Sequence, residues 1–452
     1  MKSKKLLLLN TVDKRLVDDE LFVPTNGLPG FEPISLGIIA ALTPKNWNVE
    51  LIDENFEDFT DTDAELVGIS AYTTSINRAI DISNKLRKKG IKTIIGGKHA
   101  CLYPEELGNL FDSVVEGEAE SVWKEIISDF ENKSLKKIYK GEFINLSDYT
   151  RPNRDIFYKY NYEIATIQFS RGCVNNCYFC CVPVLYKHTY RQRKIEDVIQ
   201  ELKEIKQKYI FFIDDTIYCD NKSNKKIKEL FIEIRKSNIN KHIIVAASIN
   251  IYEDDEFLDL AHKAGVKVLY IGFESENIED LKNVNKRMNY KSSEFHYSQA
   301  VKKIHRYKMA IMGGFISGFE NDTPDKIIKR GQYILKSDID ASTLTILTPL
   351  AKTPLFENLK AENLLLHTNF PQDWIYYNAC NYTIDYKKDR AEIMNAFYSS
   401  SLNLVDCRNV RKKFLKTLLR TRSYTTAKAL LVLVRNFHIG TQNCWIMKKL
   451  IK

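Results

Sequence analysis

Short apolar runs alternate with amphipathic stretches along the first 140 residues of the chain. Apolar runs bounded by polar residues are typical of buried strands, whereas apolar residues at three- and four-residue spacing indicate helices. Residues 1–140 are therefore predicted to form a doubly wound, Rossmann-like parallel sheet, because strands that alternate with helices are joined by right-handed crossovers. The expected strands are 5–10, 49–52, 65–71, 91–95 and 113–115, and the expected helices are 34–42 and 76–89.

The alternation resumes at residue 162 and repeats six times. Six strand–helix units are too few to close an eight-stranded barrel, so residues 162–375 are predicted to form a partial (β/α)6 TIM barrel, open on one side. The stretch 141–161 is expected to be a linker, and 376–452 a helical region with a basic tail. The expected barrel strands are 164–169, 209–213, 243–247, 268–273, 309–316 and 344–347.

Polar residues and glycines follow the apolar runs within residues 1–140. Doubly wound sheets bind ligands in the crevice beyond the carboxyl ends of their strands. The sequence therefore predicts a binding edge at these positions. Its candidate residues are Asn10, Thr73, Thr74, Gly96, Gly97, His99, Glu116 and Gly117.

Three cysteines, Cys173, Cys177 and Cys180, follow the first barrel strand with the spacing Cys-x3-Cys-x2-Cys. One loop with this spacing can supply three thiolates to a [4Fe–4S] cube, which leaves the fourth iron open to a small molecule. The alternative is a structural zinc site, but such sites usually pair two Cys-x2-Cys units or add histidines. Cys181 is expected to be a packed thiol.

The cysteine loop resembles that of the radical S-adenosylmethionine (SAM) superfamily. The resemblance implies that SAM chelates the open iron and that Phe179 lies beside the adenine. It also implies that the carboxylates of Asp214 and Asp215, which follow an apolar strand, accept hydrogen bonds from the SAM ammonium. Alternatively, these two residues cap the next helix. Further SAM-contact candidates at or after strand ends are Ser248, Glu274, Ser275 and Arg287.

The first half of the chain resembles the cobalamin-binding domain found ahead of many radical SAM domains. The matching stretches are 33–37, 68–70, 95–99 and 114–118. The resemblance implies a cobalamin over the strand ends. Lys98 replaces the family's usual proline, and the Asp-x-His-x-x-Gly signature that supplies a cobalt ligand elsewhere is absent. The alternatives are a domain that keeps the fold without the cofactor, or one that docks substrate, with His99 as a packing histidine.

The resemblance implies reductive cleavage of SAM to a 5′-deoxyadenosyl radical, followed by cobalamin-dependent methylation of an unactivated carbon. The alternatives are radical cyclisation, carbon–carbon coupling or oxidation without methyl transfer, and an iron–sulfur protein for electron transfer or redox sensing. A methylthiotransferase is not favoured, because those enzymes need three further cysteines in the first domain, where this chain has only Cys101. A flavodoxin or ferredoxin is the expected electron donor.

The net charge of +9 is unevenly distributed over the 452 residues. Residues 408–452 contain twelve Lys or Arg and no Asp or Glu, so the rest of the chain sums to about −3, that is 9 minus 12. Interleaved with apolar residues, this tail suggests peripheral contact with an anionic membrane and a lipid-like substrate. The alternative is a helix packed on the acidic remainder of the protein. Nucleic acid is not expected, because the tail lacks interleaved aromatics.

A cytoplasmic protein is expected from two features of the sequence. The apolar N-terminal stretch ends at Asn10, which is too short for a signal peptide, and no run approaches the ~20 apolar residues of a membrane span. Nine cysteines spread over a chain of this length do not indicate a disulfide framework.

Overall fold

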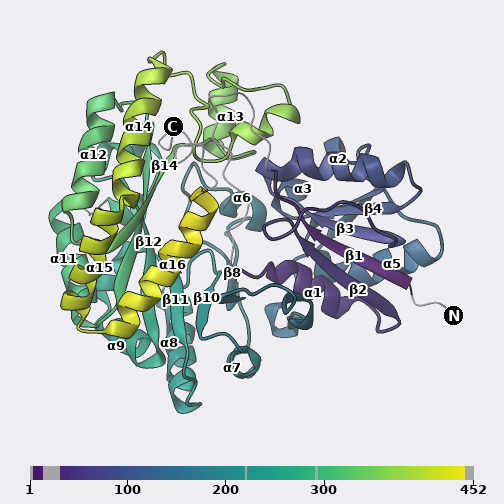
Figure 1. Ribbon diagram of the computed structural model, residues 1–452, viewed down its shortest axis with the longest axis horizontal. Coiled ribbons are helices and arrows are strands. Elements are labelled where there is room, and N and C mark those ends of the chain that lie inside the picture. The colour runs from purple at the N-terminus through teal and green to yellow at the C-terminus, as the bar shows by residue number, and fades with distance from the viewer. Residues whose placement is uncertain (1–3, 14–30, 219–220, 291–293, 443–452) are drawn as a thin grey trace. The chain divides into compact units, whose positions relative to one another are not determined.

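A computed structural model describes residues 4–13, 31–218, 221–290 and 294–442 (Figure 1). Residues 443–452 of the basic tail lie outside these ranges. The described chain divides into two compact units. The first contains the residues up to Glu163 and the later segment His367–Asn378, and the second contains Ile164–Leu366 and Ala379–His438.

The first unit is built on a parallel sheet of six strands in the order β2-β1-β3-β4-β5-β6. Helices α1 and α5 pack on one face, where Leu8, Leu66 and Ile94 are buried, and α2 covers the other (Figure 1). The strands are β1 (Lys4–Asn10), β2 (Trp47–Asp53), β3 (Leu66–Ser70), β4 (Lys92–Gly96), β5 (Ser113–Gly117) and β6 (Ile138–Gly141). The helices are α1 (Ile34–Leu42), α2 (Ile76–Arg87), α3 (Lys98–Leu102), α4 (Pro104–Leu107) and α5 (Trp123–Glu131).

Residues 141–161, expected to be a linker, instead fold against this sheet. Phe157 is fully buried in the core beside α1 and β1, and the hydroxyl of Tyr160 donates to the carbonyl of Leu51 at 3.2 Å. Aromatic side chains that have an apolar surface to cover do not stay in solvent, since burial of each is worth about 1.5–3 kcal/mol. The strand β6 was also not expected, because a run of four residues carries little periodicity.

The second unit contains a parallel sheet whose strands lie in sequence order, β14-β13-β12-β11-β10-β7. Its order and direction are those of the predicted partial barrel. The strands are β7 (Ile164–Ile167), β10 (Tyr209–Phe212), β11 (His242–Ala247), β12 (Val266–Glu274), β13 (Ala310–Ser317) and β14 (Ala341–Ile346). The helices are α6 (Val182–Tyr186), α7 (Ile195–Glu204), α8 (Asn221–Lys236), α9 (Asp255–Ala264), α10 (Ile278–Asn283), α11 (Glu294–Arg306), α12 (Pro324–Lys336) and α13 (Pro354–Ala361).

The C-terminal part of the chain is helical, as predicted. It contains α14 (Arg390–Val405), α15 (Cys407–Thr421) and α16 (Tyr424–Gln442). Helix α14 packs along α12, and α15 follows it after a single residue, Asp406, whose carboxylate caps the new helix. Within the described residues, no helix combines the length and hydropathy needed to cross a bilayer.

Candidate functional site

The cysteine loop is closed at its base by a two-stranded ribbon. Strand β8 (Ser170–Gly172) pairs with β9 (Tyr190–Gln192), so that residues 173–189 form a loop above the end of β7. Gly172 has a φ of +94°, and a Cβ there would lie 2.0 Å from the carbonyl oxygen of Thr189. Only glycine fits this position, since other residues would be strained and would clash with the returning chain.

Two carboxylates hold the ribbon from the neighbouring strand. Asp214 accepts hydrogen bonds from the backbone of Phe169, at 3.1 Å, and from both the backbone and the hydroxyl of Ser170. Asp215 accepts from the backbone N–H of Gly172 at 3.0 Å. Both follow β10, which pairs directly with β7. Asp214 and Asp215, the residues predicted to accept hydrogen bonds from the SAM ammonium, therefore hold the base of the cysteine loop in position.

Burial sets the protonation of Asp214. Burial raises the pKa of this carboxyl to about 7. The hydrogen bonds from Ser170 and Phe169 oppose this rise, whereas the nearby Asp215 carboxylate adds to it. A carboxyl with such a pKa exchanges its proton near neutral pH, and each state changes how many donors it can accept.

The three cysteines share this loop but differ in exposure. Cys177 is buried, whereas Cys173 and Cys180 are half-buried. Burial raises the pKa of Cys177 above its usual range and that of Cys180 to about 12. A metal must therefore displace the thiol protons when it binds. The sulfur of Cys173 also accepts from the backbone and side-chain amides of Asn175, both at 3.4 Å.

The spacing of the thiols, and not their placement in the structure, separates the two chemistries considered for them. Within the described residues, no three Cys, His, Asp or Glu side chains converge on a point where one ion could sit. Three cysteines on one loop can each ligate a different iron of a cube, whereas a structural zinc site usually adds a second pair of cysteines or histidines. Cys181 directly precedes α6, and its role as a packed thiol stays a prediction.

A buried ion pair lies beside the thiols. The Nζ of Lys286 is 2.8 Å from the Oε1 of Glu274, which has a positive φ of +61° at the bulged end of β12. Burial lowers the pKa of Lys286, but the charges of Glu274, Cys177 and Cys180 outweigh it and raise this pKa above its usual range. Lys286 is thus a fixed cation facing the cysteine loop.

Hydrogen bonds tie the segment that carries Lys286 to the loop. Asn285 donates to the carbonyl of Asn176 at 2.6 Å, and the N–H of Tyr178 donates to the carbonyl of Val284 at 3.0 Å. Arg287, the predicted contact for SAM, donates to the side chain of Asn285 at 2.9 Å, and its contact with SAM stays a prediction. Lys286 was not among the predicted site residues. Without the fold, the sequence does not tell which of two adjacent cations, Lys286 or Arg287, lies beside the cysteines.

The other predicted SAM contacts lie at the same edge of the sheet. Phe179 packs against the apolar cluster that contains Val284 and Phe319. Ser248 directly follows β11 and begins the next turn, where its carbonyl accepts from the N–H of Ile251 at 3.3 Å. Ser275 is fully buried, and its hydroxyl donates to Asp280 at 2.7 Å.

Arg330 connects the loops that follow β12 and β13. Its guanidinium lies 2.7 Å from both Asp280 and Asp322 and donates to Ser275 at 3.2 Å. Asp322 in turn accepts from the backbone of Gly318 at 2.8 Å. A fully buried arginine among carboxylates fixes both loops, because losing either partner would leave a buried charge unpaired. No sequence pattern distinguishes Arg330 from the other Lys and Arg residues of α12.

The strand ends of the first unit form a different edge. A Cβ added at Gly96 would meet no atom of the described residues within 4 Å, so the backbone there faces open space. Asn10 donates to Asp53 at 2.9 Å, while Thr74 lies buried in the turn after β3. Gly117 ends β5 with a φ of +92°, and Glu116 precedes it half-buried. A Cβ at Gly117 would lie 2.2 Å from the carbonyl oxygen of Gly141, so among these glycines the open backbone is that of Gly96. Open backbone at a strand end fits the flat face of a corrin ring.

His99 has the surroundings of a packed histidine. It is buried, its Nδ1 lies 3.2 Å from the hydroxyl of Thr73, and its ring meets that of Trp374 edge-on at 5.4 Å. Burial lowers the pKa of His99 to about 3, so the imidazole is neutral at physiological pH. Trp374 belongs to the segment His367–Asn378, which also accepts a hydrogen bond from Asn77 at the carbonyl of Gln372.

Comparisons with known proteins find a match to a known family in each half of the chain. The model of the radical SAM superfamily matches residues 167–334, and that of the B12 binding domain matches residues 30–127. The bacteriochlorophyllide d C-12(1)-methyltransferase of Chlorobaculum tepidum is 29% identical over 372 residues, which cover 79% of this chain and 78% of that protein. The hopanoid C-2 methylase of Rhodopseudomonas palustris is 26% identical over 78% of this chain and 67% of its own.

Two solved structures share the fold over nearly the whole chain. One is the radical SAM methyltransferase TsrM from Kitasatospora setae with cobalamin and a [4Fe–4S] cluster bound, with a TM-score of 0.65 and 14% identity over 96% of this chain and 100% of that one. The other is the cobalamin-dependent radical SAM enzyme OxsB with aqua-cobalamin and SAM bound, with a TM-score of 0.67 and 16% identity over 99% of this chain and 80% of that one.

Proposed function

We propose that this chain, which belongs to the radical SAM superfamily and carries a B12-binding domain, is a cobalamin-dependent enzyme that methylates an unactivated carbon. The observation that carries the proposal is the pair of edges in one chain: a braced three-cysteine loop on one sheet and an open, glycine-lined edge on the other. The relatives named as methyltransferases support methyl transfer over the other radical reactions.

The cofactors supply the reactive chemistry, since a reduced cluster cleaves SAM to a 5′-deoxyadenosyl radical and cobalamin carries the methyl group. In the proposal, Cys173, Cys177 and Cys180 each hold one iron and leave the fourth for SAM. Lys286 stabilises the anionic thiolates and adjacent negative charge, and Glu274 holds Lys286 in place. Asp214 keeps the loop in its shape before and after the cluster binds.

The open edge of the first unit holds the corrin in this proposal. The face offered by Gly96 is backbone alone, so a planar ligand can approach it closely. His99, buried under Trp374 and neutral, supports this edge by packing, and is not the proposed lower ligand of cobalt.

The substrate in this proposal is large and mostly apolar, in keeping with a lipid-like molecule. The relatives act on a bacteriochlorophyllide and on hopanoids by name, and both are fused-ring compounds with extensive apolar surface. A flavodoxin or ferredoxin is the proposed reductant, and peripheral contact with a membrane through the basic tail is the proposed location.

Anaerobic reconstitution with iron, sulfide and hydroxocobalamin tests the proposal. The protein is then given SAM labelled in its methyl group, a reductant, and apolar fused-ring substrates. We expect 5′-deoxyadenosine, S-adenosylhomocysteine and a labelled product. Three results together would replace methylation by the radical cyclisation or oxidation alternative. They are formation of 5′-deoxyadenosine, no transfer of the labelled methyl group to any substrate, and no corrin absorbance after desalting. If SAM is not cleaved at all, the enzyme assignment fails.

A further inference from the structure

We infer that helix α15 docks on the surface of an anionic phospholipid membrane. The inference deepens the proposed function, on which it rests for its biological setting, by assigning the membrane contact to particular residues. The contact surface consists of one face of α15, the end of α12 and the exposed side of α16.

The outward face of α15 mixes cations with leucines. At 3.6 residues per turn its members fall within roughly 140° of the helix circumference. Two of them are strongly exposed apolar residues, Leu415 at 58% and Leu419 at 75%. Apolar side chains left in water beside cations are typical of helices that lie in a membrane interface. The face consists of Arg408, Arg411, Lys412, Leu415, Lys416 and Leu419, and Arg422 follows the helix in the left-handed conformation.

The cations of this face form no ion pairs with carboxylates of the described residues. Neither the four cations of the face nor Arg422 after the helix makes an ion pair with another residue that the structure describes, whereas Arg420, on the inner side, pairs with Asp338. Lys413, also on the inner side, donates to the carbonyls of Ser337 at 2.8 Å and Ile339 at 2.6 Å. The inner cations bind the protein, so the outer ones remain for an external anion.

A hollow lined by lysines lies where α15 meets the end of α12. Its volume is ≈ 280 Å³, enough for a phosphate group with part of its hydration shell. No carboxylate lines it, so its charge complements the phosphates of an anionic lipid surface. The lining residues are Leu335, Lys336, Asn409, Lys412, Lys413 and Lys416.

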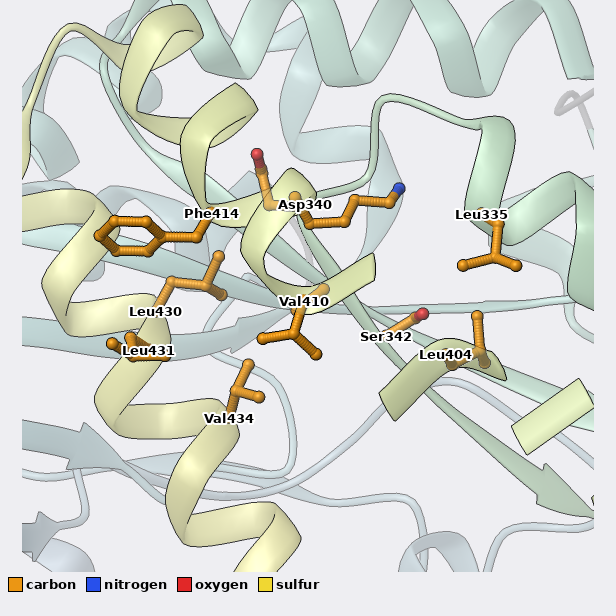
Figure 2. Close-up of a pocket in the computed structure, with 11 residues that line it drawn as sticks. Leu335, Asp340, Ser342, Leu404, Val410, Phe414, Leu430, Leu431 and Val434 are labelled. Carbon is orange, nitrogen blue, oxygen red and sulfur yellow. The ribbon is translucent and has the colours of Figure 1, made fainter. Parts of the chain in front are cut away.

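The apolar cavity beneath α15 decides between a membrane surface and a single extracted lipid. Figure 2 shows Phe414, Val410, Leu430 and Val434 gathered between α15 and α16. The cavity they line measures ≈ 40 Å³, room for about one water and far too little for an acyl chain. The acyl chains must therefore stay in the bilayer. Helix α15 also contacts α14 and α11, which hold it on the second unit.

Nucleic acid is the competing polyanion for this surface. Proteins that hold single strands stack successive bases on aromatic side chains. The described part of this surface exposes one large aromatic, Tyr424, and otherwise aliphatic residues such as Leu431 on α16. Exposed leucines suit an acyl boundary better than a stack of bases.

Vesicle flotation with the cofactor-loaded full chain tests the inference. We expect binding to vesicles of phosphatidylcholine that contain phosphatidylglycerol, no binding to phosphatidylcholine alone, and release at high salt. The variant K336S/K412S/K416S should bind about 100-fold more weakly, at about fivefold for each cation removed. The variant L415S/L419S should lose binding without any change of charge.

A matched control removes equal charge elsewhere. Lys88, Lys124 and Lys137 are exposed in the first unit and make no ion pair with described residues, so K88S/K124S/K137S should bind vesicles as the wild type does. Three results would each overturn the inference. The first is an equal loss of binding in this control, and the second is equal binding to neutral vesicles. The third is preferential binding of a single-stranded oligonucleotide that L415S/L419S does not weaken. SAM cleavage in solution should be unchanged in all three variants, so a failure of docking is distinguishable from a failure of the proposed chemistry.

Discussion

The carboxyl edges of the two six-stranded sheets differ in what occupies them. In the second unit, carboxylates from β10 reach across to the ribbon below the cysteines, and Arg330 joins two further loops. In the first unit, glycine backbone faces open space, with a neutral histidine and a tryptophan packed beside it. A ligand that is bonded to side chains requires those side chains to be held in position. A flat ligand bound by van der Waals contact requires instead a stretch of backbone that no side chain covers.

The largest expected effect lies at the braced edge. Cys173→Ala, Cys177→Ala and Cys180→Ala should each abolish the reducible cluster and reduce 5′-deoxyadenosine formation to background, since three thiolates are the minimum for a cube with one open iron. Anaerobic visible absorbance and product chromatography measure both. Cys181→Ala is the matched control and should remain active. An inactive Cys181→Ala beside an active Cys180→Ala would reassign the third ligand.

The next effect lies at the open edge. Gly96→Trp should prevent retention of cobalamin after desalting, because its side chain enters space that the protein leaves open. Gly96→Ala should retain it. Gly97 is a poorer probe, because its φ is +102° and a Cβ would lie 2.9 Å from the carbonyl of Ala71, so any change there also strains the fold. Stoichiometric corrin in Gly96→Trp would place the cofactor elsewhere.

Arg330 tests whether bracing matters beyond the cysteine loop. Arg330→Met leaves buried carboxylates without a counter-charge and should lower the free energy of unfolding by about 3–5 kcal/mol. It should also raise KM for SAM more than it lowers kcat, since the loops after β12 and β13 lose their shared anchor. Arg330→Lys should restore part of the stability. A destabilised variant with an unchanged KM for SAM would make Arg330 purely structural.

A pH dependence of stability is expected from Asp214. Its pKa is about 7 in the fold, raised chiefly by burial from an ordinary value of 3.8. Between these values the native state binds more protons than the unfolded state, so the stability should fall as pH rises from about 4 to about 7. Asp214→Asn, which cannot ionise, should flatten the decline in calorimetric melting of the apoprotein. An unchanged slope would assign it to other groups.

The features that sequence reasoning reached are local ones. Strands such as β1 and β13 appear as apolar runs, and the cysteine spacing lies within one loop, so neither requires knowledge of the fold. The fold class was correctly predicted for the same reason. The cysteines as cluster ligands, and the remaining predicted site residues, stay predictions.

The features it missed depend on contacts between distant residues. Lys286 gains its role from lying beside Cys177, and Trp374 gains its role by joining a unit that is otherwise formed from the first 163 residues. For Asp214 the motif was seen, but the pairing of β10 with β7 directs its carboxylate to the loop backbone. A local sequence pattern can identify a candidate carboxylate, but it does not show which residue that carboxylate will contact in the fold.

Asp214 and Asp215 hold the ribbon below the cysteine loop by hydrogen bonds to its backbone N–H groups, and these bonds do not involve the thiols. If the proposed cluster is lost to oxidation, we therefore expect the loop to keep the shape in which it can receive a new one.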